Sequence, residues 1–107
     1  MPEGRYISQA ERARRLIEKG ITAWQRFQAF AMGNDELVDS VVLRGQELWL
    51  PHHETDGRRF RVTLVISLHF PPAAAKEARA AVAAFLEALS QELSDEEGTL
   101  AVRAEAE

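Results

Sequence analysis

The sequence contains no cysteine, and this absence removes several kinds of chemistry at once. Thiol catalysis, cysteine-ligated zinc, iron–sulfur clusters and disulfide scaffolding all require a sulfur atom that the chain lacks. Long apolar runs are missing too, because no stretch approaches the roughly 20 apolar residues of a membrane span and the first residues hold no signal-peptide core. We therefore expect a soluble, cytoplasmic or intracellular protein, and we assign it no cofactor.

An excess of positive charge is also missing. The 107 residues carry 13 Lys and Arg against 17 Asp and Glu, a formal net charge of -4. Residues 1–61 hold ten basic and nine acidic side chains, whereas residues 62–107 hold three and eight. A net-acidic chain is a poor general binder of phosphate backbones, so nucleic acid ranks below protein as a partner. The length fits one domain, which we place at residues 1–107.

What the sequence does contain is one long alternating stretch, RRFRVTLVISLHF, at residues 58–70. Its even-numbered positions from Phe60 to Phe70 are all apolar, and its odd-numbered positions are mostly polar. A period of two over this length predicts a β-strand with one face in a core and the other nearer water. We expect it to be the central strand of the domain.

The first helix is indicated by a capping box at residues 8–11 and by the turn formers Gly33-Asn34 at its end. Gly20 lies inside it and marks a point where the helix could kink or break. Apolar residues at three- and four-residue steps predict its buried stripe. That stripe comprises Ala10, Ala13, Ile17, Ile21, Trp24, Phe27 or Gln28, and Ala31.

The remaining elements follow from turn residues and periodicity. Residues 40–44 and 47–50 predict either a short hairpin or one strand bent at Gly45. Residues 73–93 predict a second helix, and residues 99–104 a last short strand. The fold class is α+β, a single two-layer domain in the order helix, short hairpin or bent strand, long central strand, helix, strand. Which face of the sheet the first helix covers stays open.

The histidines are the first candidates for a site. His52 and His53 precede the long strand and His69 lies near its far end, roughly 30 Å away along an extended chain, which argues against a shared metal site. His52-His53 followed by a strand and a helix is similar to part of the His-His-Pro motif of pterin carbinolamine dehydratases, although Glu54 stands where that family has proline. In that family the histidines line the pterin site. The corresponding hypothesis for this chain is a small ligand-binding protein or enzyme with a pocket between the helices and the sheet, reached by His52 or His53 and lined by aromatic side chains such as Trp24, Phe27 and Phe30.

The outward face of the sheet is a candidate for protein contact. If the even-numbered residues point inward, Trp49 points outward, beside arginines of the central strand. An aromatic side chain among arginines is typical of partner-binding surfaces. The alternatives are that Trp49 is buried under the first helix or covered by an arginine stem. The interface candidates on this face are Trp49, Arg59, Arg61 and Val65.

A second interface candidate lies on the second helix. Ala80, Ala84 and Ala88 recur at four-residue steps and make a smooth seam that would let another helix approach closely. Alanine is also the best helix former, so the seam has a second explanation.

These features favour a non-enzymatic assembly or protein-interaction module that acts as a homo-oligomer, with the last strand as an edge able to pair with a neighbour. The order and strand pattern of the last fifty residues, with a long strand ending in Phe70-Pro71, is loosely similar to phage tail-terminator proteins. That resemblance implies a structural role in rings. We expect no catalytic residue, no metal and no membrane contact, and the partner would be a second copy or another protein.

An RNA-binding module is the remaining alternative. Arg12, Arg15 and Lys19 share one face of the first helix and could form a phosphate patch. The segment KEARAAVAAFLEAL is similar to the second helix of double-stranded-RNA-binding domains, which begins with Lys-Lys. Here Pro-Pro-Ala-Ala-Ala occupies that position, so the phosphate-binding charge is missing.

Overall fold

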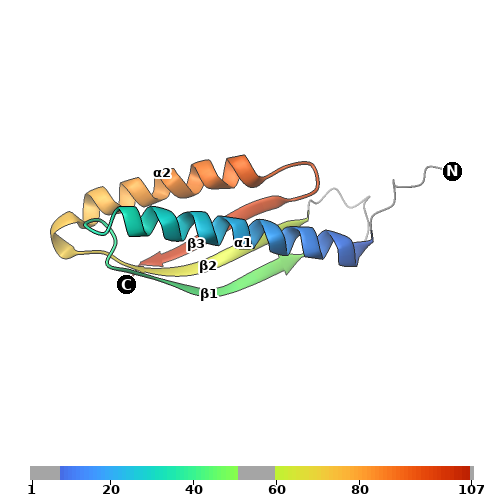
Figure 1. The fold of residues 1–107 in the computed structure, drawn as a ribbon, viewed down its shortest axis with the longest axis horizontal. Helices are drawn as coiled ribbons and strands as arrows, with labels where there is room; N and C mark the ends of the chain where they lie inside the picture. Colours follow the sequence, from blue (N-terminus) through green and yellow to red (C-terminus); the bar gives the residue numbers. More distant parts are fainter. Residues whose placement is uncertain (1–7, 51–59, 107) are drawn as a thin grey trace.

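The computed structural model describes residues 8–50 and 60–106. The elements follow the predicted order of helix, strand, strand, helix and strand (Figure 1). They are α1 (Gln9–Gly33), β1 (Ser40–Trp49), β2 (Arg61–His69), the short 3-10 turn η2 (Pro72–Ala74), α2 (Ala75–Leu93) and β3 (Thr99–Ala106). The fold class predicted from the sequence, a small α+β domain, is confirmed.

The three strands form one mixed sheet in the order β1-β2-β3. The long alternating strand is therefore central, as predicted, with β1 antiparallel and β3 parallel to it. Of the two alternatives for residues 40–50, the bent strand is the one observed. Leu43 pairs with Ile66 but Gly45 pairs with Val65, so Arg44 is an extra residue in a β-bulge.

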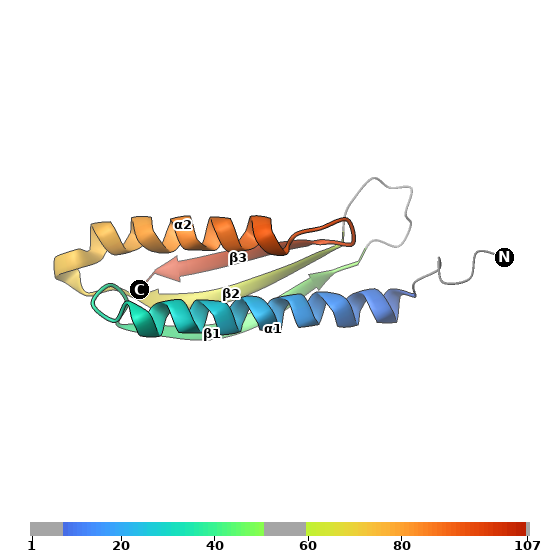
Figure 2. The same ribbon diagram turned by 45° about the horizontal axis from the view of Figure 1, so that its top comes forward.

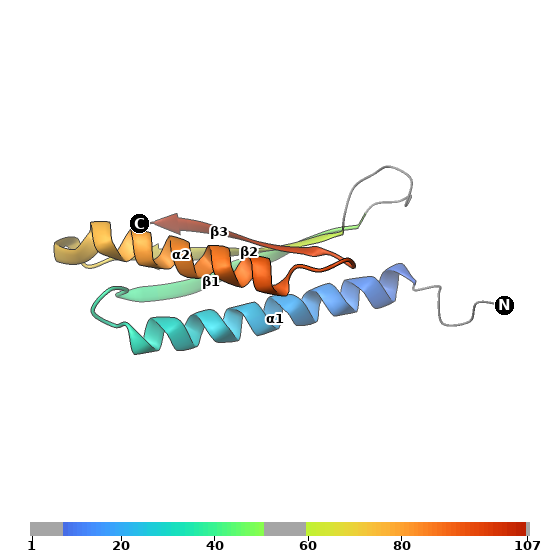
Figure 3. The same ribbon diagram turned by 90° about the horizontal axis from the view of Figure 1, so that it is seen from above.

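Both helices cover the same face of the sheet, which answers the question that the sequence left open (Figures 2 and 3). α1 packs over β1 and β2, whereas α2 packs over β3. The even-numbered residues of β2 point into this layer and are buried, as the alternation predicted. The largest fully buried side chains come from all layers: Leu16 and Phe27 of α1, Val62 and Ile66 of β2, Leu89 of α2, and Leu100 of β3.

The predicted start and end of α1 are observed. Ser8 caps the helix, because its Oγ accepts a hydrogen bond from the Glu11 N–H at 3.1 Å. Asn34 follows Gly33 and donates from its side chain to the Phe30 carbonyl at 2.8 Å. The helix is continuous through Gly20, where the sequence had indicated a possible kink.

The predicted buried stripe of α1 was right at Phe27 and in the packing of Trp24 and Ala31, but wrong at Ile17 and Ile21, where the buried side lies about a quarter turn away. Ile17 and Ile21 are 39% and 48% exposed, and the buried positions are Leu16, Gly20, Ala23 and Phe27. The reason is the close approach of α1 to the sheet. A Cβ atom at Gly20 would lie only 2.6 Å from Nε2 of Gln46, so a larger residue would require the Gln46 side chain to move, whereas glycine lets the helix rest directly on it.

Candidate functional site

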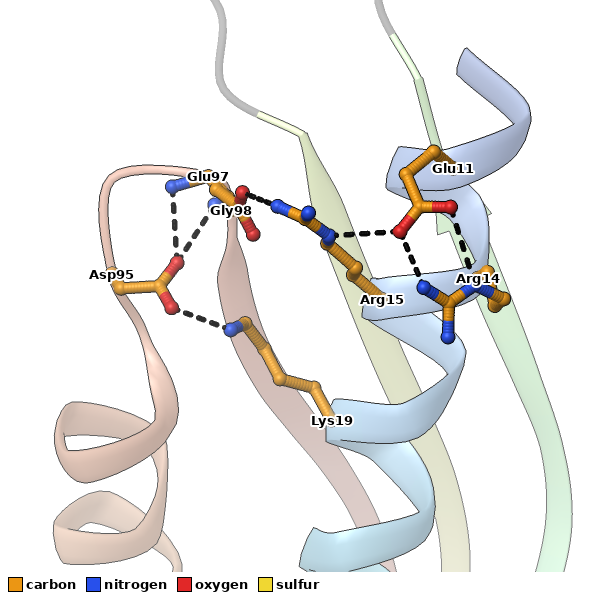
Figure 4. A network of polar contacts seen from close by, with 7 residues as sticks. All are labelled: Glu11, Arg14, Arg15, Lys19, Asp95, Glu97 and Gly98. Atoms are coloured by element: carbon orange, nitrogen blue, oxygen red, sulfur yellow. Dashed lines mark hydrogen bonds and ion pairs between the residues drawn. The ribbon is translucent and has the colours of Figure 1, made fainter. Parts of the chain in front are cut away.

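The basic face of α1 is turned toward the protein itself (Figure 4). Arg15 pairs with Glu97, and Lys19 Nζ lies 2.7 Å from a carboxylate oxygen of Asp95, so both cations hold the turn between α2 and β3. The Arg12 guanidinium lies over the Phe60 ring, 4.4 Å from its centroid. The three residues considered as a phosphate patch thus each have a partner within the chain.

Asp95 organises that turn. Its Oδ1 accepts hydrogen bonds from the backbone N–H groups of Glu97 at 3.0 Å and Gly98 at 3.3 Å. Partial burial alone would raise the pKa of the Asp95 carboxyl, but the hydrogen bonds from Lys19 and from these N–H groups outweigh it and lower the pKa. The ionised form of Asp95 is therefore the one that fits the folded chain.

The histidine site cannot be built from the described residues. His52 and His53, together with the interface candidate Arg59, lie outside them. His69 is exposed at the end of β2, with Nε2 3.8 Å from a carboxylate oxygen of Asp39. Within residues 8–50 and 60–106, no group of three His, Asp or Glu side chains is placed to hold a metal ion. In the same residues, neither helix is apolar enough over sufficient length to cross a membrane.

The aromatic side chains proposed as a pocket lining pack on one another. Phe30 stacks on Phe85 with ring centroids 4.3 Å apart, and Phe27 lies 5.9 Å from Phe30 and 6.1 Å from Phe85. Trp24 packs against the same core. Among the described residues, no cavity large enough for a water molecule opens beside Trp24 and Phe27. These rings join α1 to α2.

The face of the sheet that the helices leave uncovered carries the predicted outward residues. Trp49 lies on it opposite Arg61, so Trp49 is not under α1. Val65 is only 8% exposed. It pairs with Arg103 of β3, whose guanidinium reaches across the sheet to Glu47 of β1 at 3.3 Å. The long arginine stem covers the centre of this face.

The alanine seam and a groove lie on the α2 side. Ala80, Ala84 and Ala88 are exposed, as expected. A groove of about 650 Å³ runs between α2 and β3, with Arg79 and Glu87 on its helix side. β3 forms one edge of the sheet and β1 the other.

The most apolar surface lies on the opposite side of the molecule, along the edge formed by α1 and β1. Six large apolar side chains are exposed in the described part of the chain, and all six belong to α1 or β1. The sixth, Met32, is near the C-terminal end of α1, and the other five lie along this edge. Ile17 and Ile21 lie on the side of α1 that faces away from α2, since Lys19 and Arg26 occupy the side that contacts the α2 region. We call this surface the α1–β1 flank, defined as Ile17, Ile21, Val42, Leu43 and Leu48. Leu43 and Leu48 lie on the helix side of β1, and Val42 lies on its uncovered side.

The sequence did not predict the α1–β1 flank. Ile17 and Ile21 had been placed in the core, and the even-numbered Leu48 had been expected to point inward. The one signal in the sequence was a second possible buried stripe of α1, formed by Leu16, Gly20, Ala23 and Phe27. When this stripe faces the sheet, the two isoleucines point away from it.

Comparison with known proteins found no matching family model, no matching curated protein and no matching solved structure. The function has therefore to be argued from the surfaces described above.

Proposed function

We propose that the protein is a non-enzymatic assembly module that acts as a homo-oligomer. The α1–β1 flank carries this proposal, because five exposed large apolar side chains gather beside a strand edge that no other described strand pairs with. Contiguous apolar surface mostly marks a place of protein contact, and an unpaired edge offers backbone N–H and C=O groups to a further strand. We take the partner to be a second copy of the chain, because such an assembly requires no other kind of protein.

The mass in solution tests this proposal. Light scattering and sedimentation of the full chain at micromolar to millimolar concentration should give a multiple of 12.0 kDa. The variant Ile21→Glu should shift the protein toward the single-chain mass, because it places a charge in the contact. A wild-type protein of single-chain mass at every concentration would contradict the proposal.

A second candidate function, binding of a small ligand, is favoured by the groove between α2 and β3. Its volume of about 650 Å³ lies within the usual range of ligand pockets, and Arg79 and Glu87 supply charged groups. Filling the groove with Ala83→Trp should abolish ligand-induced thermal stabilisation and leave the mass unchanged. A screen of small anions and metabolites in which no compound raises the melting temperature would remove this candidate.

A further inference from the structure

We propose that two copies of the chain pair antiparallel along the outer edge of β1, about a two-fold axis that passes between Gly45 and Gln46. This inference rests on the proposed function, since it names the partner and the register that cover the α1–β1 flank. Three independent features of β1 and one of α1 select the same axis.

The first feature is which face each side chain occupies. Leu43 and Leu48 pair with Ile66 and Val62 of β2, so both point to the core face, on either side of the bulge. The bulge adds one residue and so shifts the alternation by one. An axis between Gly45 and Gln46 accommodates this shift, because it brings Leu43 opposite Leu48 of the second copy. The neighbouring pairs also match in face: Val41 with Leu50, Val42 with Trp49, and Arg44 with Glu47. Gly45 and Gln46, at the axis itself, are the exception, because they pair with Val65 and Leu64 and so lie on opposite faces, and Gly45 has no side chain to place.

The second feature is the direction of the backbone groups. Thr99 N donates to the Phe60 carbonyl at 2.8 Å, so even-numbered positions of the central strand turn their backbone groups toward β3 and odd-numbered ones toward β1. Leu43 and Leu48 stand opposite even-numbered residues, and their own N–H and C=O groups therefore point to the outer edge. In the proposed register they face each other, as a hydrogen-bonded pair requires. Val42 and Trp49 stand opposite odd-numbered residues, so their pair is a non-hydrogen-bonded one, whereas Gln46, opposite Leu64, also turns its backbone groups to the outer edge.

The third feature is charge. Arg44 would lie opposite Glu47 of the second copy, and the two-fold axis makes this contact twice. Both side chains are exposed on the uncovered face of the sheet. Within one chain Arg44 Nε donates to Ser67 Oγ at 2.8 Å and Glu47 accepts from Arg103. A guanidinium carries five N–H donors and a carboxylate accepts several hydrogen bonds, so each group can take part in more than one contact. A register shifted by two residues would place Glu47 opposite Val42 and lose both ion pairs.

The helix layer selects the same axis. A Cβ at Gly20 would touch the Gln46 side chain, so this part of α1 lies over the axis, with Ile17 and Ile21 on its outer side. Because α1 packs over both β1 and β2, it is set back from the edge by about half of the 4.8 Å strand spacing. The two α1 helices would then be about 10 Å apart, the usual distance for packed helices. Ile17 of one copy meets Ile21 of the other.

The other edge of the sheet does not offer this arrangement. α2 packs over β3 itself, so a symmetric β3 pair would bring the two α2 helices within about 5 Å, which is too close for packed helices. The outward backbone groups of Leu100 are moreover already used, by Ser94 Oγ at 3.0 Å and Ser90 Oγ at 2.5 Å. The β1 edge is therefore the one that pairs, and the product is a continuous six-stranded sheet.

Charge reversal with mixing tests the register. Arg44→Glu and Glu47→Arg each place two like-charged pairs across the axis, and each should weaken the dimer by about tenfold in sedimentation equilibrium. An equimolar mixture of the two variants should restore wild-type association, because every contact across the axis is then between opposite charges. Glu87→Arg, a reversal at an exposed position on α2, is the matched control and should leave association unchanged. Circular dichroism checks that each variant is folded.

The outcomes separate this inference from the function on which it rests. A wild-type chain that never associates overturns both. Association that survives both reversals, or that the mixture fails to restore, overturns the β1 register and leaves the homo-oligomer in place. Loss of association in Glu87→Arg instead would place the contact on the α2 side and equally overturn the register.

Discussion

Replacing Gly98 with alanine should destabilise the domain by a steric clash that neither neighbour can fully relieve. Gly98 is buried in the turn between α2 and β3. A Cβ there would lie 2.7 Å from Leu16 Cδ2 and 2.9 Å from the Phe60 carbonyl oxygen. The leucine methyl can move, but the carbonyl is held by the Thr99 N–H at 2.8 Å. The substituted chain must therefore shift its backbone.

The expected change in the free energy of unfolding of Gly98→Ala is the sum of two opposing effects. Forcing one extra methyl group into packed surroundings costs about 1–3 kcal/mol, and the lower entropy of the unfolded alanine chain returns about 0.4–1 kcal/mol. The net loss of about 1–2 kcal/mol should lower the melting temperature by roughly 5–15 °C. Thermal unfolding followed by circular dichroism at one fixed protein concentration measures it.

Gly33→Ala is the matched control for this experiment. A Cβ at Gly33 has no atom within 4 Å, and the residue ends α1, so the substitution should leave the melting temperature equal or slightly higher. Equal melting temperatures for Gly98→Ala and the wild type would refute the reasoning, as would an equal loss in both variants.

Two further predictions concern the core and the turn. Ile66→Asp should unfold the domain, because Ile66 is 1% exposed and the carboxylate would have no partner, whereas Ile21→Asp at an exposed position should stay folded by circular dichroism. A folded Ile66→Asp variant would mean that the two faces of β2 are assigned backwards. Asp95→Asn keeps the Oδ1 acceptor but loses the ion pair with Lys19. Because the folded chain lowers the pKa of Asp95, the wild type should be the more stable protein at pH 6 and should lose that advantage as the pH falls through and below about 4. A difference in melting temperature between the two proteins that stays constant from pH 2 to pH 6 would contradict this.

Much of the fold could be predicted because β2 alternates so regularly. One parity of this strand is apolar throughout, so its central position and its buried face both followed from a period of two. α1 was harder, since it contains two apolar stripes about a quarter turn apart. Side-chain hydrophobicity favours the stripe with Ile17 and Ile21, but packing favours the one with Gly20, because the missing side chain at Gly20 lets the helix lie directly on Gln46.

The α1–β1 flank was less predictable than the fold, because its exposure depends on how the elements pack together. The outward direction of Trp49 follows from alternation and is confirmed by its pairing with Arg61. Whether a strand lies at an edge, however, depends on strand order, which the sequence of β1 does not specify. The exposure of Leu43 and Leu48, and with it the α1–β1 flank, therefore required the structure.

Disulfide trapping tests the central claim most directly, and the absence of cysteine makes it clean. In the proposed dimer Val42 of one copy lies opposite Trp49 of the other, with Cα atoms about 4.5 Å apart, within the range of a disulfide. Mixing Val42→Cys chains with Trp49→Cys chains under mild oxidation should give a cross-linked species of twice the chain mass, and neither variant alone should give it at a comparable rate. Efficient cross-linking of one variant with itself, or none in the mixture while the chains still associate, would contradict the pairing of two copies along β1.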